Sequence, residues 1–185
     1  MNLSDLFFWT SADNNTGLEN IRGDELAALI AATIPGANPN IGLGAQINRG
    51  AGQNISTGTP TTAIFTSEIF DDLGFADLGA NNDRLTIPVT DPQITRVMLT
   101  AEASWQNNAS GTRGHAVSFN GSSGFGDNLS FNRNRPPTNS LQNALFTYTT
   151  QLIPVVPGDF FGIKLEQDGA PSLQWRGYLT LVVLQ

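Results

Sequence analysis

Apolar and polar residues alternate along the last two thirds of the chain, with the period of two that is typical of half-buried β-strands. The clearest case begins at Arg96, where one face of the segment would carry Val97, Leu99, Ala101, Ala103 and Trp105. Shorter alternating runs lie near 62–67, 84–89, 115–119 and 144–156. Turn signals separate the runs, and the Asn120-Gly121 pair strongly favours a tight reverse turn. We therefore expect seven or eight short strands in an antiparallel sandwich or jelly roll.

The last two runs are the most informative. Pro157, Gly158 and Asp159 form a turn signal that precedes an alternating segment from 160 to 167. The final segment, from Trp175 onward, is largely apolar. Strands that are apolar on both faces are usually covered on both faces, so we expect the final strand to lie inside a sheet or an assembly.

The first 35 residues have a different pattern. Apolar residues of the segment 24–34 fall on one face at helical spacing, and Pro35-Gly36 would end the helix. A short helix with one apolar stripe is not stable alone, so it either packs on its own domain or docks on a partner. We take 1–35 as a docking segment whose candidate contact residues are Leu6, Phe7, Phe8, Trp9, Leu26, Leu29 and Ile30.

Residues 36–59 are rich in glycine, asparagine, serine and threonine, and we see no periodicity in them. Such a composition is typical of a linker, either extended or flexible. The alternative is that the segment is ordered against a neighbouring subunit. The predicted organisation is thus a helical anchor (1–35), a linker (36–59) and a β-head (60–185).

The surface is polar but weakly charged. Charged residues are 14% of the chain and the net charge is −7, against about 25% charged residues in typical soluble domains. Lys164 is the one lysine. This balance argues against nucleic acid and against anionic membranes as partners.

Cysteine is absent, which excludes disulfides and thiolate metal sites. No apolar run approaches the roughly 20 residues that span a bilayer, so we expect no membrane insertion. The N-terminus lacks a basic region followed by an apolar run, so we expect no secretory signal and synthesis in a cytoplasm.

Catalytic chemistry finds little support in the sequence. His115 is the single histidine, and its phase with Val117 and Phe119 favours a structural role on a strand face. No nucleophile elbow, phosphate-binding loop or zinc-protease motif occurs. We expect neither an enzyme nor a bound cofactor.

Two groups of charged residues are candidate ligand sites. The first group is acidic: Glu68, Asp71, Asp72, Asp77 and Asp83. Such residues could supply the oxygen ligands of a calcium site or the carboxylate pair of a glycosidase. Their spacing matches neither kind of site, so we favour the interpretation that they are solvated loop acids. The second group is Arg133 and Arg135, which lie in a long polar loop (121–142). Their guanidinium groups could bind an anionic sugar or a neighbouring subunit. We again favour the interpretation that the loop is solvated. We retain Asp71, Asp72, Asp77, Arg133 and Arg135 as possible ligand-loop residues, and expect Trp105 and Trp175 in the core.

The order of these features resembles a known family. It comprises the segment 84–89 (RLTIPV), a long alternating strand that ends in tryptophan, the turn at 119–121 (FNG), the segment 157–161 (PGDFF) and the C-terminal Trp-x-Gly of 175–177. Over about 60–185 this is similar to the C1q/tumour necrosis factor-like jelly roll, in the form found in bacteriophage virion proteins. The middle strands lack the dense run of aromatic residues in that pattern. In the family, Gly158-Asp159 would make the turn before a core strand and Gly177 would lie in the terminal strand.

The resemblance implies a compact homotrimer. A cysteine-free, weakly charged β-domain also gains by burying a sheet face against copies of itself. The implied function is a phage virion structural protein: a surface decoration, cement or head-fibre protein whose N-terminal segment docks on the major capsid protein or another virion protein. The alternative is the receptor- or glycan-binding tip of a tail fibre, which requires a host-surface glycan as partner. An enzyme acting on polysaccharide is disfavoured by the lone histidine and the unmatched acids.

Overall fold

The structure, a computed structural model, describes residues 40–91, 93–106, 108, 110–122, 132–134, 144–169 and 172–184. These residues form strands and no helix, as expected for the β-head. The strands are β1 (Gly44–Ser56), β2 (Thr61–Thr62), β3 (Ser67–Asp71), β4 (Ala76–Asp77), β5 (Asn81–Thr86), β6 (Arg96–Trp105), β7 (Arg113–Phe119), β8 (Asn132–Asn134), β9 (Ala144–Thr149), β10 (Ile153–Pro154), β11 (Phe160–Gln167) and β12 (Ser172–Val183).

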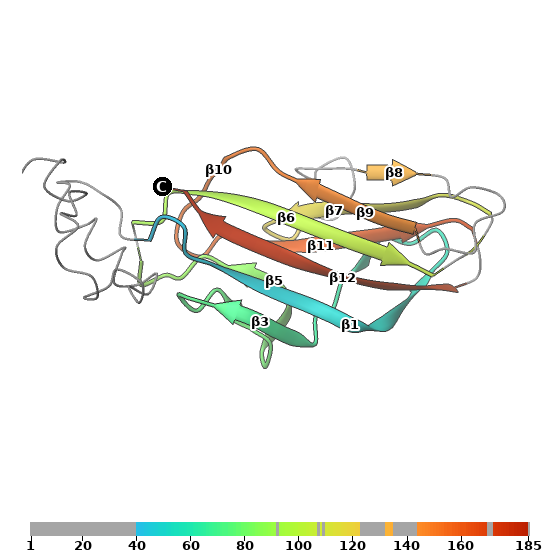
Figure 1. The fold of residues 1–185 in the computed structure, drawn as a ribbon, viewed down its shortest axis with the longest axis horizontal. Coiled ribbons are helices and arrows are strands. Elements are labelled where there is room, and N and C mark those ends of the chain that lie inside the picture. Colours follow the sequence, from blue (N-terminus) through green and yellow to red (C-terminus); the bar gives the residue numbers. More distant parts are fainter. Residues whose placement is uncertain are drawn as a thin grey trace, which may run out of the picture.

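The strands form two sheets that pack face to face (Figure 1). Sheet A has the order β10-β6-β12-β1-β3, and β9 also pairs with β6. Sheet B has the order β4-β5-β11-β7-β8, and β2 also pairs with β11. The pairs are antiparallel, and the chain crosses between the sheets repeatedly, for example from β5 to β6, from β6 to β7 and from β11 to β12. This connectivity is that of a jelly-roll sandwich.

Alternation along the strands sends one set of apolar side chains into the space between the sheets. Trp105 and Trp175 are opposite each other in β6 and β12 and are fully buried, which confirms their assignment to the core. Phe65 meets Trp175 edge to face, with ring centroids 6.1 Å apart. Burial of such aromatic side chains is the main stabilising contribution of this core.

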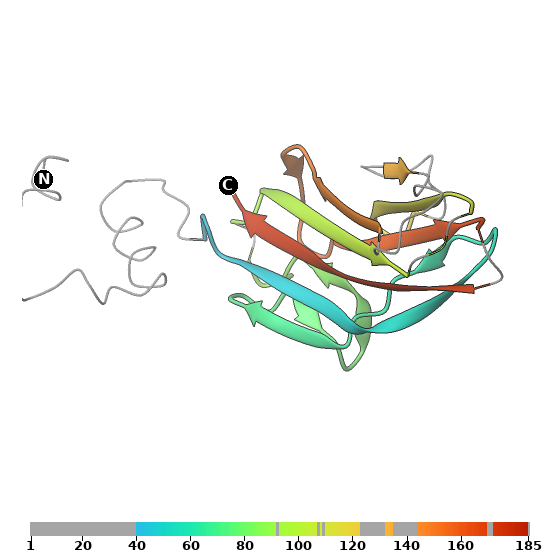
Figure 2. The same cartoon turned by 45° about the vertical axis from the view of Figure 1, so that its right-hand side comes forward.

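The last strand lies inside sheet A, as the apolar C-terminal run predicts. β12 pairs with β6 on one side and with β1 on the other (Figures 1 and 2). Gly177 sits in its middle, opposite Ala103. A Cβ on Gly177 would lie 1.9 Å from the carbonyl oxygen of Glu102, so the neighbouring backbone leaves no room for a side chain.

The predicted linker contains a strand of this sandwich, which corrects the boundary at residue 60. Residues 44–56 form β1, which lies between β12 and β3. Its Ala45, Ile47 and Ile55 are fully buried. Glycines at 44, 50 and 52 dilute the alternation, so the composition resembles a linker although the inward positions are apolar.

Two predicted turns are confirmed and are joined to each other. Asn120 and Gly121 have φ values of 48° and 74°, and the Ser122 N–H donates to the Phe119 carbonyl at 3.1 Å, as in a type I′ turn. The Asn120 side chain donates to Asp159 at 2.8 Å and accepts from the Phe160 N–H at 2.9 Å. The turn before β11 is therefore fixed by the turn after β7.

The predicted helical anchor at 1–35 lies outside the described residues, together with its seven candidate docking residues. Within the part of the chain that the structure describes, no helix is long and apolar enough to cross a membrane.

Candidate interaction face

The outward side of sheet A carries an apolar row near the end where β12 finishes. Val97 and Val183 point into the core, so Met98 and Val182, which pair with each other, point outward. Ile153 pairs with Val97 and points inward, which places the preceding Leu152 beside Met98.

Leu184 continues the same side, since its N–H donates to the Arg96 carbonyl at 3.0 Å. Leu152 is 44% exposed and Leu184 is 38% exposed. We call Met98, Leu152, Val182 and Leu184 the apolar row.

Uncharged polar residues cover the adjoining part of sheet A. The Thr100 and Thr149 hydroxyls are 3.1 Å apart, and the Gln46 side chain donates to Thr180 at 2.7 Å. These cross-strand contacts tie β9, β6, β12 and β1 together across one face.

Glu102 on this face is hydrogen bonded to a tyrosine. Glu102 lies opposite Tyr178. Burial and the hydrogen bond to Glu102 raise the pKa of Tyr178, so the phenol stays protonated at neutral pH. The same outward side also carries Arg96 and Arg176. The low cost of desolvation therefore applies to the uncharged stretch between Arg96 and Glu102, not to the whole face.

A cavity of about 330 Å³ opens at the edge of the same sheet. Its described lining residues are Tyr148, Thr150, Gln151, Leu152, Ile153 and Pro154. The cavity and the apolar row thus share Leu152. The two surfaces are therefore continuous, and together they form one interaction face at this edge of sheet A.

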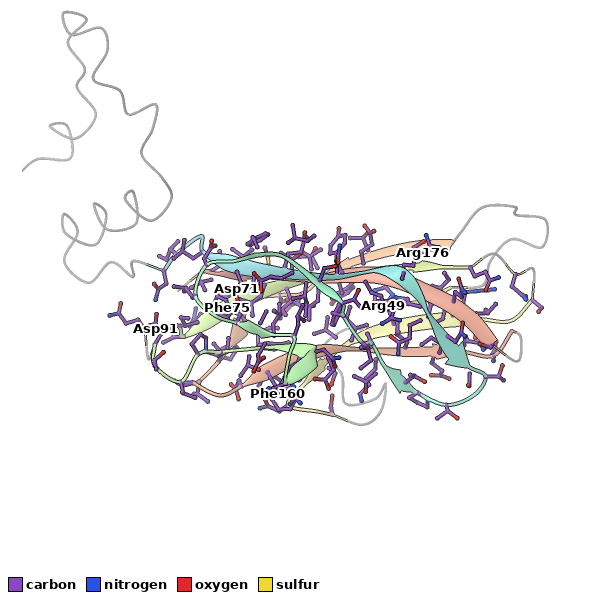
Figure 3. All side chains as sticks on the ribbon, turned by 90° about the horizontal axis from the view of Figure 1, so that it is seen from below. Arg49, Asp71, Phe75, Asp91, Phe160 and Arg176 are labelled. Atoms are coloured by element: carbon purple, nitrogen blue, oxygen red, sulfur yellow. The ribbon has the colours of Figure 1, made fainter. Side chains whose placement is uncertain are left out.

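The candidate ligand acids are acceptors for nearby backbone groups. Asp71 accepts from the N–H groups of Gly74, Phe75 and Ala76, each at 2.9 Å, and the labelled Asp71 and Phe75 lie close together in Figure 3. This carboxylate closes the turn between β3 and β4 as an Asx-type acceptor.

Asp72 and Asp77 also accept from backbone N–H groups, and Asp83 pairs with an arginine. Asp72 accepts from the Gly44 N–H at 2.9 Å, and Asp77 accepts from the Ala80 N–H at 3.1 Å. Glu68 lies in β3, and Asp83 pairs with Arg84 at 2.8 Å. Among the described residues, no three acidic or histidine side chains gather where they could hold a metal ion.

Arg133 is in β8, opposite Gly114 of β7, and Arg135 lies outside the described residues. The structure thus places Asp71, Asp72 and Asp77 around the β3–β5 region, while β8 is at the far edge of sheet B. Asp71 and Asp72 are adjacent in sequence, but their carboxylates bond to different segments, at 73–76 and at Gly44.

His115 is fully buried in β7, opposite Leu165 of β11, in agreement with a structural histidine. Burial lowers its pKa to about 4, so the imidazole is neutral at physiological pH. Solvent and substrates have no access to this side chain.

The apolar row itself was not among the residues selected from the sequence. Met98 alternates with Arg96, Thr100 and Glu102 on the more polar face of its strand, so the pattern does not single it out. Val182 lies in a continuous apolar run where period-two alternation gives no direction. Pairing of β6 with both β10 and β12 brings these residues together.

No protein-family model matches the chain, and no curated protein matches it. Solved structures do. The globular domain of zebrafish complement 1qA protein superposes with a TM-score of 0.52 at 10% identity, over 77% of this chain and 98% of that one. Eiger TNF from S. frugiperda gives a TM-score of 0.50 at 10% identity, over 78% of this chain and 94% of that one. The chain therefore has the C1q/TNF-like jelly-roll fold.

Proposed function

We propose that the protein is a non-catalytic structural component of a bacteriophage virion. In this proposal, residues 40–184 contain a homotrimeric head. Residues 1–35 dock on the major capsid protein or another virion protein, and the head projects outward as a decoration, cement or head-fibre protein. The protein is made in the host cytoplasm and assembles onto the particle. The fold and the order of sequence features that resembles phage virion proteins support this proposal.

The apolar row is the observation that carries the trimer. Covering exposed leucine side chains with a partner stabilises the assembly by about 25 cal/mol per Å² of apolar surface removed from water. The uncharged polar residues beside the row extend it into a surface of low desolvation cost. The cavity that includes Leu152 provides the unlike surface that a closed ring requires.

The end of the sandwich where the described chain begins, at Asn40, is also apolar at its surface. Ile41, Val89 and Val156 are 52%, 74% and 62% exposed. Two hydrogen bonds join the loops that carry Val89 and Val156, from the Ile87 N–H to Asp159 and from the Gly158 N–H to Ile87. An apolar end at Asn40, the first described residue after the proposed docking segment, suits a head that stands on a larger particle.

Light scattering coupled to size exclusion tests the trimer. We expect three times the protomer mass for the wild type at micromolar concentration, and a monomer for Leu152→Glu, because a charge would be buried in the interface. Val89→Glu is the matched control: it places the same charge on an exposed apolar residue outside the apolar row, and should remain trimeric. A wild-type monomer under these conditions would rule out the trimer.

Antibody labelling of intact particles tests the virion assignment. We expect label on the capsid surface in electron micrographs, and loss of particle binding when residues 1–35 are deleted from a head that remains trimeric. Label confined to the tail tip would instead support the alternative, a receptor- or glycan-binding tail-fibre tip. Absence of the protein from purified particles would contradict both.

A further inference from the structure

A small hollow lies on the outward side of sheet B, on the opposite layer from the apolar row. Its volume is about 40 Å³, and its described lining residues are Thr62, Asp83, Arg84, Ser118, Gly121, Phe160, Gly162 and Lys164. Gly162 of β11 is at the centre, because it pairs with Arg84 on one side and with Ser118 on the other. Phe160 and Lys164 flank it along the strand and point the same way, since Phe161 and Ile163 are buried in the core.

The backbone requires glycine at the centre of the hollow. A Cβ on Gly162 would lie 2.7 Å from the Asp83 carbonyl oxygen, a distance that real Cβ contacts do not show. The absent side chain leaves an open floor between two cationic residues. The space is large enough for an ordered water or a group such as a carboxylate, and too small for a sugar ring.

Arg84 is held in place on the wall of this hollow. Its Nε donates to Asp83 Oδ1 at 2.8 Å, and its guanidinium carbon lies 4.4 Å from the centroid of the Phe160 ring. These contacts use Nε and one face of the guanidinium, and among the described residues none uses its two Nη groups. A fixed guanidinium with both Nη groups available is the fork that binds a carboxylate through two parallel hydrogen bonds.

Lys164 supplies a second cation. Its Nζ donates to the Thr62 hydroxyl at 2.6 Å, which uses one of the three ammonium donors. The chain has a net charge of −7 and a single lysine, so a cationic pair in one hollow is unusual for this molecule. The acids nearby are Asp83, which is bound to Arg84, and Glu166, which follows Lys164 on the same face of β11 but does not line the hollow.

We propose that this hollow binds the carboxylate group of an acidic saccharide. The carboxylate enters above Gly162, where the Arg84 fork and the Lys164 ammonium neutralise it, and the sugar ring remains outside on the rim. Thr62 and Ser118 also line the hollow. The Thr62 hydroxyl accepts from Lys164, so its own proton can be donated to the bound carboxylate. The site is built by one protomer, so it requires neither the trimer nor attachment to a virion.

Titration of the full-length protein with glucuronate, followed by isothermal calorimetry or by chemical shifts, tests the site. We expect saturable binding with Kd in the millimolar range, about −4 kcal/mol, which is reasonable for a single sugar. Glucose, which has the same ring without the acid, should not bind. Arg84→Gln and Lys164→Gln should each weaken glucuronate binding about tenfold, the loss expected for one charge-assisted hydrogen bond.

Arg176→Gln is the matched control, because it removes one positive charge from the exposed side of sheet A. Figure 3 shows the labelled Arg176 and Phe160 on opposite layers of the sandwich. This variant should bind glucuronate as the wild type does. Unchanged circular dichroism of all three variants would show that they fold.

Several results would overturn the site. These are no binding of glucuronate up to about 50 mM, equal binding of glucose, or an equal loss in Arg176→Gln. Inorganic phosphate that binds more tightly than glucuronate would overturn the carboxylate assignment. Because the trimer is assessed separately by light scattering, failure of this site would leave the proposed assembly unaffected, and a monomeric protein would still be expected to bind glucuronate.

Discussion

His115 shows how one buried side chain couples stability to pH. Its imidazole lies between the two sheets, and burial lowers its pKa from 6.5 to about 4. Above pH 6.5 it is neutral in the folded and the unfolded chain. Between pH 6.5 and 4 the unfolded chain binds a proton that the folded chain excludes, so the free energy of unfolding falls as the pH falls. Below about pH 4 both states are charged and this loss is complete.

The expected contribution is about 3 kcal/mol, since each unit of pKa difference corresponds to about 1.4 kcal/mol. His115→Gln keeps a polar side chain but removes the titrating group. Urea unfolding at pH 7 and pH 4 should therefore show a larger loss of stability in the wild type than in the variant, by about that amount. Carboxylates titrate equally in the wild type and the variant, so their contribution to the pH dependence cancels when the two proteins are compared. Parallel pH profiles would show that His115 carries no such coupling.

The tight packing around Gly177 predicts that a larger residue at this position destabilises the fold. Alanine there would bring a methyl group against the Glu102 carbonyl and within 2.9 Å of the Trp175 ring. We expect Gly177→Ala to reduce the free energy of unfolding by about 3 kcal/mol or more, because both neighbours are fixed in the core. Gly50→Ala in β1 is the control, since nothing lies within 4 Å of its added Cβ, and it should change stability by less than about 0.5 kcal/mol. Similar stabilities of the two variants would contradict this reading of sheet A.

Sequence patterns identified residue burial better than residue role. Trp105, Trp175 and His115 follow from strand alternation, because burial depends mainly on local phase. The role of Asp71 does not follow, because its acceptance of backbone N–H groups depends on how the chain turns after β3. Likewise, Arg84 and Lys164 are far apart in sequence and meet only through the pairing of β5 and β2 with β11.

Among the elements, β1 was not predicted from the sequence, because its composition is that of a linker. Alternation is present at Ala45 and Ile47, but glycines interrupt it and a register shift lies between Arg49 and Gln53. From Arg49 to Gln53 strand β1 advances four residues while β12 advances two. The inward phase is kept, but no large apolar residue lies between Ile47 and Ile55 to mark it, so a search for period two loses the strand. By contrast, β6 and β11 have unbroken alternation, and the turn at Asn120-Gly121 has a local sequence signal.

Truncation distinguishes a strand from a linker. A chain that begins at Asn40 should show a cooperative urea transition, because it retains every described strand. A chain that begins at Thr57 should show none, since it lacks the buried Ala45, Ile47 and Ile55 and leaves β12 without its second partner. Equal transition midpoints for the two truncated chains would show that residues 44–56 do not stabilise the sandwich and act as a linker.

At the scale of the whole molecule, assembly should make thermal stability depend on concentration. If copies associate through the apolar row, mass action stabilises the folded trimer as protein concentration rises. We expect the wild-type Tm to increase by about 2–4 °C for a tenfold increase in concentration, and the Tm of Leu152→Glu to stay constant. Differential scanning calorimetry measures both. A concentration-independent wild-type Tm would contradict association through this face.

The jelly-roll class was predictable, because the alternating runs, the turn spacing and the final apolar strand all indicate one architecture. The strand number was not: the sequence predicted seven or eight strands and the structure describes twelve. The interaction face was not, because it combines residues of β1, β6, β9 and β12 with Leu152, which precedes β10. Local sequence contains no information about which outward positions become neighbours across strands. The hollow over Gly162 depends in the same way on three strands from distant parts of the chain.

The pairing of β1 with β12 also has a consequence in time. Gln46 and Thr180 are 134 residues apart and bond to each other. At about 5–20 residues per second, a ribosome makes β1 roughly ten seconds before its partner exists. During that interval β1 and β6 lack the strand that lies between them, and their unpaired backbone groups can join other nascent chains. Translation speed and chaperone supply should therefore limit the yield of this protein more than its final stability does.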